Sequence, residues 1–165
     1  MAASRLQREL KKRRPFDSAE QEAALNLFRT SDRLQHQFAQ LFRAHDLSGA
    51  QYNILRILRG AGEPLPILEI AARMVAVVPG ITGLVDRLET AGLVERRRCT
   101  DDRRVIFVAA TAKATELLAK LDEPVVALHK QLLGNLNKSE LKELIRLLEK
   151  IREGGYDDVT STQGK

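Results

Sequence analysis

One segment of the chain, residues 79–110, constrains the fold more than any other. It opens with a Pro-Gly pair and predicts a helix that ends just before Gly92, a residue suited to the position after a helix C-cap. Two strands are predicted next, at residues 93–98 and 104–110, and the second is a dense β-branched and aromatic run. Residues 96–104 hold five arginines and two aspartates. The segment therefore predicts a helix leading directly into a hairpin with a highly charged tip.

A short helix is predicted upstream, at residues 66–74, and with the following helix it fits a helix-turn-helix. In such a unit the second helix lies in the DNA major groove. Four of its apolar residues would face the core: Ile81, Leu84, Val85 and Leu88. Five others would face solvent or DNA: Gly80, Thr82, Gly83, Asp86 and Arg87. Two ordinary core helices would give the same pattern, but the hairpin that follows favours a winged helix.

Arginine suits the tip of such a wing, because its planar guanidinium pairs with phosphates and fits narrow, electronegative minor grooves. Asp102 can pair with Arg104 across the tip and fix its direction. A formal net charge of +5 and a pI of about 9.6 also favour a polyanionic partner. An ordinary solvated turn is the alternative interpretation.

Capping signals divide the rest of the chain into helices. The predicted pairs are Ser18 with Gln21, Ser48 with Gln51, and Asn137 with Glu140. Glycines and prolines at residues 60–66 predict a loop with at most a short extended piece. Thr111 or a neighbour would cap a long helix that Pro124 bends or interrupts near a joint.

The helical parts at residues 18–46 and 112–153 carry apolar stripes that need more partners than one small helix-turn-helix provides. We therefore expect these parts to form a dimerisation region. Residues 47–111 would form the winged helix-turn-helix domain between them. Residues 1–17 are predicted to be a basic arm, and residues 154–165 a disordered tail.

The segment GLVERRRCTDDRRVIFVAAT, preceded by PGITGLVDRLETA, resembles the winged-helix core of the multiple-antibiotic-resistance regulator (MarR) family. The Asp-x-Arg signature of that family's wing is matched by residues 102–104. Its D-R-L-E, G-L-V, R pattern is matched by residues 86–89, residues 92–94 and Arg96. A Leu-Ser-x-x-Gln helix start is matched by residues 47–51, and the resemblance covers about residues 18–153.

This resemblance implies a mainly α-helical, homodimeric, cytoplasmic transcription regulator of bacteria or archaea. First and last helices would interlock two chains, and two winged helices would contact a pseudo-palindromic operator, with recognition helices roughly 34 Å apart. Many members of the family are repressors that release DNA when a small aromatic or phenolic ligand binds. Others sense oxidation through cysteine.

The expected DNA contacts come from the recognition helix and the wing. Thr82 and Arg87 would enter or flank the major groove. From the wing, Arg103 and Arg104 would reach the minor groove or phosphates, oriented by Asp102. Arg97 and Arg98 would add positive charge toward the phosphates. His45 and Tyr52 flank the joint between the first two long helices and are candidates for the family's ligand cleft. Ordinary packing is the alternative role for both.

The chain departs from the family pattern near the recognition helix. Gly83 stands where many relatives carry arginine, and Val77 and Val78 replace polar residues. Val78 would also lack the hydroxyl of a typical N-cap residue, which costs about 1 kcal/mol of helix stability. Ala114 replaces a glycine common after the wing. A protein with this recognition helix either relies on its wing and on DNA shape, or binds DNA weakly or with a narrow sequence preference.

Two other functions remain open. One is a dimeric protein-interaction module that does not recognise an operator, and the other is a small-molecule binding protein or enzyme.

Other functions find little support in the sequence. The single cysteine, Cys99, excludes an internal disulfide and fits a reducing compartment; a lone cysteine beside arginines is more often incidental than a redox sensor. Three scattered histidines predict no metal site, and no catalytic motif or cofactor-binding loop is present. The basic N-terminus lacks the apolar core of a signal peptide, and no apolar run is long enough to span a membrane. We expect a cytoplasmic protein without a cofactor.

Overall fold

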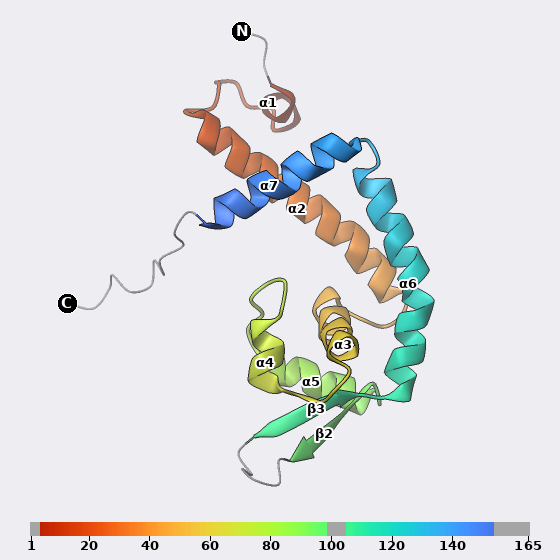
Figure 1. Cartoon of the computed structure of the whole chain (residues 1–165). Coiled ribbons are helices and arrows are strands. Elements are labelled where there is room, and N and C mark those ends of the chain that lie inside the picture. Colours follow the sequence, from red (N-terminus) through yellow and green to blue (C-terminus); the bar gives the residue numbers. More distant parts are fainter. Residues whose placement is uncertain (1–3, 99–104, 154–165) are drawn as a thin grey trace, which may run out of the picture. The chain divides into compact units, whose positions relative to one another are not determined.

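A computed structural model describes residues 4–98 and 105–153, which are mainly helical with a small antiparallel sheet (Figure 1). This confirms the predicted fold class. The elements in chain order are α1 (Arg5–Glu9), α2 (Ala19–Arg43), α3 (Gly49–Ala61), β1 (Leu65–Pro66), α4 (Ile67–Ala72), α5 (Ile81–Thr90), β2 (Val94–Arg98), β3 (Ile106–Ala110), α6 (Ala112–Leu133) and α7 (Lys138–Glu153). The chain divides into two compact units, residues 1–126 and 127–165, and α6 contributes to both.

Side-chain caps start the helices where the sequence predicts them. Ser48 accepts a hydrogen bond from the backbone N–H of Gln51 at 3.2 Å, and the Gln51 side chain accepts one from the Ser48 N–H at 2.9 Å. Asn137 and Glu140 make the same exchange at 3.0 and 2.8 Å. These bonds satisfy amides that the first helical turn leaves without partners. Side chains of two further predicted residues also act as caps: Ser18 and Thr111.

One sequence prediction about a helix end is wrong. Helix α5 has Gly80 at its N-cap, in the left-handed region at φ 73°, with no side-chain cap. Val78 is therefore not the N-cap residue, because the chain completes its turn at a glycine, which adopts positive φ at little cost. Pro124 lies inside α6, which continues to Leu133, and the boundary between the two units follows it by two residues.

The sheet has the strand order β1-β3-β2, and both pairings are antiparallel. The short extended piece predicted before α4 is strand β1, in which Leu65 pairs with Val108. Strands β2 and β3 form the predicted hairpin, in register from Val94↔Ala110 to Arg98↔Ile106. Val94 and Val108 are buried, so this face of the hairpin anchors the wing to the body of the first unit.

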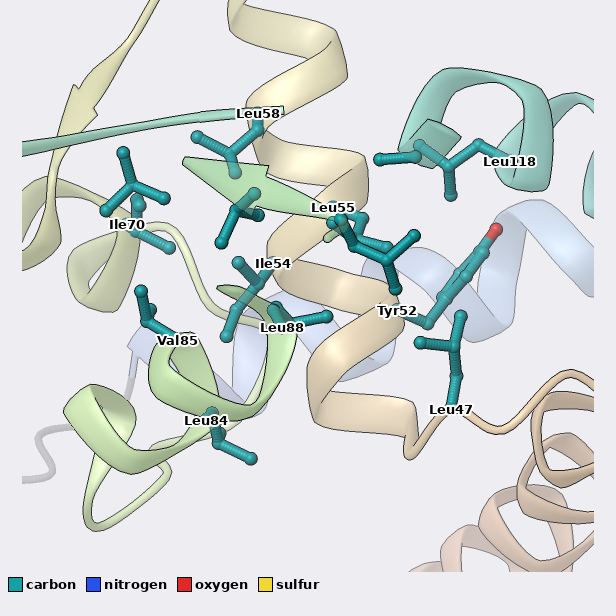
Figure 2. Packing of buried hydrophobic residues seen from close by; sticks show 14 of the residues in the cluster. Leu47, Tyr52, Ile54, Leu55, Leu58, Ile70, Leu84, Val85, Leu88 and Leu118 are labelled. Carbon is teal, nitrogen blue, oxygen red and sulfur yellow. The ribbon is translucent and has the colours of Figure 1, made fainter. Parts of the chain in front are cut away.

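The core of the first unit lies between α3, α4, α5, α6 and the sheet. Figure 2 shows Leu55 of α3 within this cluster, together with Val85 and Leu88 of α5. The largest side chains with less than 2% exposure are Ile54, Leu55, Ile70, Leu88, Leu118, Leu121, Val85 and Val108. Burial of one face of α5 fixes which of its residues point outward.

The basic arm predicted at residues 1–17 includes helix α1, which contacts α2. Leu6 is 3% exposed, and the Glu9 carboxylate accepts a 2.7 Å hydrogen bond from Arg29 Nε. Arg33 Nη2 lies 3.7 Å from the same carboxylate. These charge contacts join α1 to α2.

An ion pair joins α3 to α6. Arg59 donates hydrogen bonds from Nη1 and Nη2 to the two carboxylate oxygens of Asp122 at 2.9 and 2.6 Å. The hydrogen bonds from Arg59 lower the pKa of Asp122 below its ordinary value of 3.8, although burial acts in the opposite direction. A carboxylate with a lowered folded-state pKa stabilises the fold above its unfolded pKa, and this contribution is lost as the pH falls through the folded value.

We therefore expect Asp122→Asn to reduce the free energy of unfolding at pH 7 by about 0.5–1 kcal/mol, because the pair is bidentate but partly solvent-screened. The difference between the wild type and the variant should fade below about pH 4. Urea unfolding of both proteins at pH 7 and pH 3, at one fixed protein concentration, measures it. A difference that persisted at pH 3 would contradict this role for the ion pair.

Candidate nucleic-acid interface

Helices α4 and α5 form the predicted helix-turn-helix, and β2 and β3 follow α5 directly (Figure 1). The predicted faces of α5 are confirmed: Leu84, Val85 and Leu88 are buried, and Ile81 packs against the core. Thr82 and Arg87 are exposed on the opposite side. Arg87 has no ion pair with any residue in the described part of the chain. Both side chains are therefore free to meet a ligand outside the fold.

Arg96 of β2 binds the acidic side chains of α5. Its Nη2 lies 2.5 Å from Asp86 Oδ1, and its Nη1 lies 2.5 Å from Glu89 Oε2. The backbone N–H of Arg96 also donates to Glu89 Oε1 at 3.2 Å. Burial alone lowers the pKa of Arg96, but the hydrogen bonds with Asp86 and Glu89 outweigh it and raise the pKa above its ordinary value. The guanidinium stays charged and pairs with both carboxylates of α5, and its single positive charge offsets one of their two negative charges.

The sequence prediction missed this role of Arg96, although the residue belongs to the family pattern. The available signal was an arginine in the strand following a helix with two outward-facing acids. No local rule of spacing links these positions, because the contact depends on how β2 packs against α5. Arg96 is thus a positioning residue that joins the wing to the recognition helix.

The predicted wing residues fall into two groups. Arg97 is exposed and pairs with Glu95 on the same strand, with Nε at 2.9 Å from Oε1. This pairing reduces the net charge that Arg97 can offer a phosphate. The backbone of Arg98 ends strand β2. Residues 99–104 lie outside the described ranges, and they include Cys99, Asp102, Arg103 and Arg104. Their predicted roles stay predictions.

The two candidates for ligand binding differ in their surroundings. Tyr52 is 9% exposed, and its ring stacks on Phe42 with 4.1 Å between centroids. Its hydroxyl accepts a 3.3 Å hydrogen bond from Arg56 Nη1. His45 is half-buried just after α2, and its backbone N–H donates to the Phe42 carbonyl. Tyr52 thus has a packing role in the core, whatever else it contacts.

Gly83 lies on the outward side of α5, and a Cβ built there meets no atom within 4 Å. Glycine in a helix interior costs about 0.5–1 kcal/mol relative to alanine, and Gly83 lies in the first turn of α5, so we expect Gly83→Ala to raise the free energy of unfolding by up to about 0.5 kcal/mol. Urea unfolding at fixed protein concentration tests this. The matched variant Gly62→Ala, at φ 70°, should instead destabilise the protein. Destabilisation by Gly83→Ala would show that this site has a steric constraint.

Among the described residues, no group of three or more His, Cys, Asp or Glu side chains is placed to hold a metal ion. The helices in the described ranges also include none with the length and apolar character needed to cross a bilayer. The candidate interface is formed by the exposed face of α5, by Arg96 paired with Asp86 and Glu89, and by the hairpin of β2 and β3.

A helix-turn-helix followed by a hairpin that is fixed to its second helix defines the class of winged helix-turn-helix proteins, which dock a recognition helix in the DNA major groove. The model of the MarR family matches residues 47–106 of this chain. A solved MarR transcription factor from Planctomyces limnophilus is 47% identical, with 81% of this chain and 98% of that chain covered and a TM-score of 0.64.

Two curated regulators are also similar. The HTH-type transcriptional regulator FarR of Neisseria gonorrhoeae is 27% identical over 142 residues, covering 84% of this chain and 97% of its own length. The homoprotocatechuate degradative operon repressor of Escherichia coli is 25% identical over 112 residues, covering 68% and 75% of the two chains. The chain belongs to the MarR family, and its relatives act as transcriptional regulators, a role without catalysis.

Proposed function

We propose that this protein is a homodimeric repressor that binds a pseudo-palindromic operator in double-stranded DNA. The outward face of α5, with exposed Thr82 and Arg87 on a helix whose other face is buried, carries the proposal. A recognition helix needs such a fixed, accessible face to reach base edges. The name of the Escherichia coli relative, an operon repressor, supports repression rather than activation.

In this proposal, residues 18–46 and 112–153 form the dimerisation region and residues 47–111 the DNA-binding domain. The apolar side chains Phe28, Ile145 and Ile151 are 71, 55 and 46% exposed in the single chain, which supports burial against a second copy. Thr82 and Arg87 contact the major groove. The wing contributes the remaining contacts through Arg97, Arg98, Arg103 and Arg104, with Asp102 orienting the tip.

A small aromatic or phenolic effector would release the operator, with His45 and Tyr52 as candidate contacts. Because Tyr52 is buried against Phe42, an effector would reach it only where this packing opens. The protein acts in the cytoplasm, where its DNA lies, and has neither a catalytic role nor a cofactor in this proposal.

The test is binding of the purified protein to the DNA upstream of its own gene and to a scrambled duplex, at two salt concentrations. Selective binding that weakens with salt, by a species of twice the chain mass, is the expected result. Equal, weak binding to both duplexes would count against operator recognition at this site. An electrophoretic mobility assay with multi-angle light scattering gives both quantities.

For the wing, we expect Arg104→Ala to weaken operator binding and to reduce the slope of log K against log salt by roughly 0.9, the value for one phosphate contact. The matched control is Arg43→Ala, which removes an equal charge from an exposed position at the end of α2. Unchanged binding by Arg104→Ala would refute the phosphate-contacting role of the wing.

One observation favours a second candidate function, a dimeric protein-interaction module. The turn before α5 exposes valines and carries no charge, since no charged residue lies between Arg73 and Asp86. A protein partner would leave binding of DNA weak and unselective. The duplex-binding experiment above therefore separates the two candidates.

A further inference from the structure

The turn that joins α4 to α5 presents apolar side chains to solvent. Val75 is 90% exposed and Val77 is 101% exposed. Residues that contribute to the core of a domain are rarely this accessible, so these valines do not stabilise the fold through burial. They stand next to the recognition helix, and Val77 precedes its first residue, Ile81, by four positions.

The turn is held in place on both sides of Val77. The backbone N–H of Val75 donates a 3.0 Å hydrogen bond to Asn53 Oδ1 on α3. The side chains of Met74 and Val78 pack against the core. Val77 is thus an exposed apolar residue between anchored neighbours. Its position can be fixed before any partner binds, which lowers the entropic cost of a contact.

The surface around Val77 limits what it can recognise. From Met74 to Val85 the chain has no charged residue, and Thr82 alone supplies a polar side chain there. Among the groups that bases present in the major groove, the 5-methyl of thymine is the apolar one, and apolar side chains contact it. Arg87 of α5 and the arginines of the wing sequence would draw the same surface toward a polyanion.

We propose that Val77 contacts the 5-methyl group of a thymine in each operator half-site and so determines sequence preference where hydrogen-bonding side chains are scarce. This inference rests on the proposed operator binding. Asn53 is then a positioning residue, because it holds the turn through the backbone of Val75. A protein partner on the same turn is the other possible occupant, and the test distinguishes it.

The test begins with a duplex library of randomised sequence, from which the wild-type protein selects its preferred sites. Single thymines of the selected duplex are then replaced by deoxyuridine, which removes only the methyl group. At one symmetric pair of positions we expect about four-fold weaker binding per methyl, the factor that corresponds to burying one methyl group. Val77→Thr replaces one of the two methyl groups by a hydroxyl, so it should bind the thymine duplex more weakly and show a smaller difference between thymine and deoxyuridine.

The matched control is Val126→Thr, which makes the same chemical change at a valine on α6 that is 51% exposed. It should retain the full sensitivity to deoxyuridine. A wild-type protein that selects sites but ignores every deoxyuridine substitution would overturn the inference and leave operator binding intact. A Val77→Thr variant whose sensitivity to deoxyuridine equals that of the wild type would also overturn the inference. Failure of the wild type to select any duplex would instead reject operator binding and point to a protein partner.

Discussion

Arg96→Ala is expected to weaken operator binding by about ten-fold or more, a change of roughly 1.4 kcal/mol per factor of ten. The substitution leaves the carboxylates of Asp86 and Glu89 on the recognition helix without their partner. Two unpaired negative charges on the helix proposed to bind DNA would repel phosphates. The loss of charged hydrogen bonds at a side chain that is 21% exposed should also reduce the free energy of unfolding by about 1–3 kcal/mol.

Arg97→Ala is the matched control, because it removes the same charge from the same strand. Arg97 pairs only with the exposed Glu95 among the described residues, so we expect a smaller loss of affinity and little change in unfolding. Filter binding over a range of salt gives a second readout. Arg96→Ala should lower affinity without reducing the salt slope by a full phosphate contact, because Arg96 acts through α5.

A compensating variant separates positioning from direct contact. Replacing both acids in the Arg96→Ala background, with Asp86→Asn and Glu89→Gln, removes the repulsion and should recover much of the lost affinity. Equal losses for Arg96→Ala and Arg97→Ala, with no recovery in the triple variant, would place Arg96 on the DNA and contradict the positioning role.

Leu55→Ala is expected to reduce the free energy of unfolding by about 3–5 kcal/mol. Leu55 lies in the centre of α3, is 0% exposed and belongs to the core shared by α5, α6 and the sheet (Figure 2). Its removal leaves a cavity among well-packed neighbours, in addition to the lost transfer free energy. A domain of this size has a total stability of about 5–15 kcal/mol, so the variant should approach the unfolding threshold.

Urea unfolding at one protein concentration measures this loss, with Leu68→Ala as the control. Leu68 undergoes the same truncation on α4 but is 84% exposed, so its variant should remain within about 0.5 kcal/mol of the wild type. A loss below about 1 kcal/mol for Leu55→Ala would mean that the core relaxes to fill the space.

Together these features describe a recognition unit with little free charge on its helix. Arg96 pairs with both acids of α5, and the turn before the helix is uncharged. The unpaired charge of the described helix-turn-helix surface thus depends largely on Arg87. Such a surface would gain affinity mainly from the wing and sequence preference from small, shape-dependent contacts, including the one proposed for Val77.

The sequence by itself determined the features that depend on neighbours a few residues apart. The reciprocal caps of Ser48 with Gln51 and of Asn137 with Glu140 are local interactions, since they link positions three residues apart. The buried face of α5 followed from the helical period, and the left-handed Gly92 after α5 followed from its C-terminal position.

Only the tertiary structure decided the features that depend on contacts between elements. It placed Arg96 against two acids of α5, tied the turn to Asn53 and stacked Tyr52 on Phe42. It also put Gly80 rather than Val78 at the start of α5. Periodicity fixes which face of a helix is buried, but the partner of a side chain depends on how two elements pack and on the angle of the chain between them. This packing depends on side chains from all parts of the core, so no single segment of the sequence determines it.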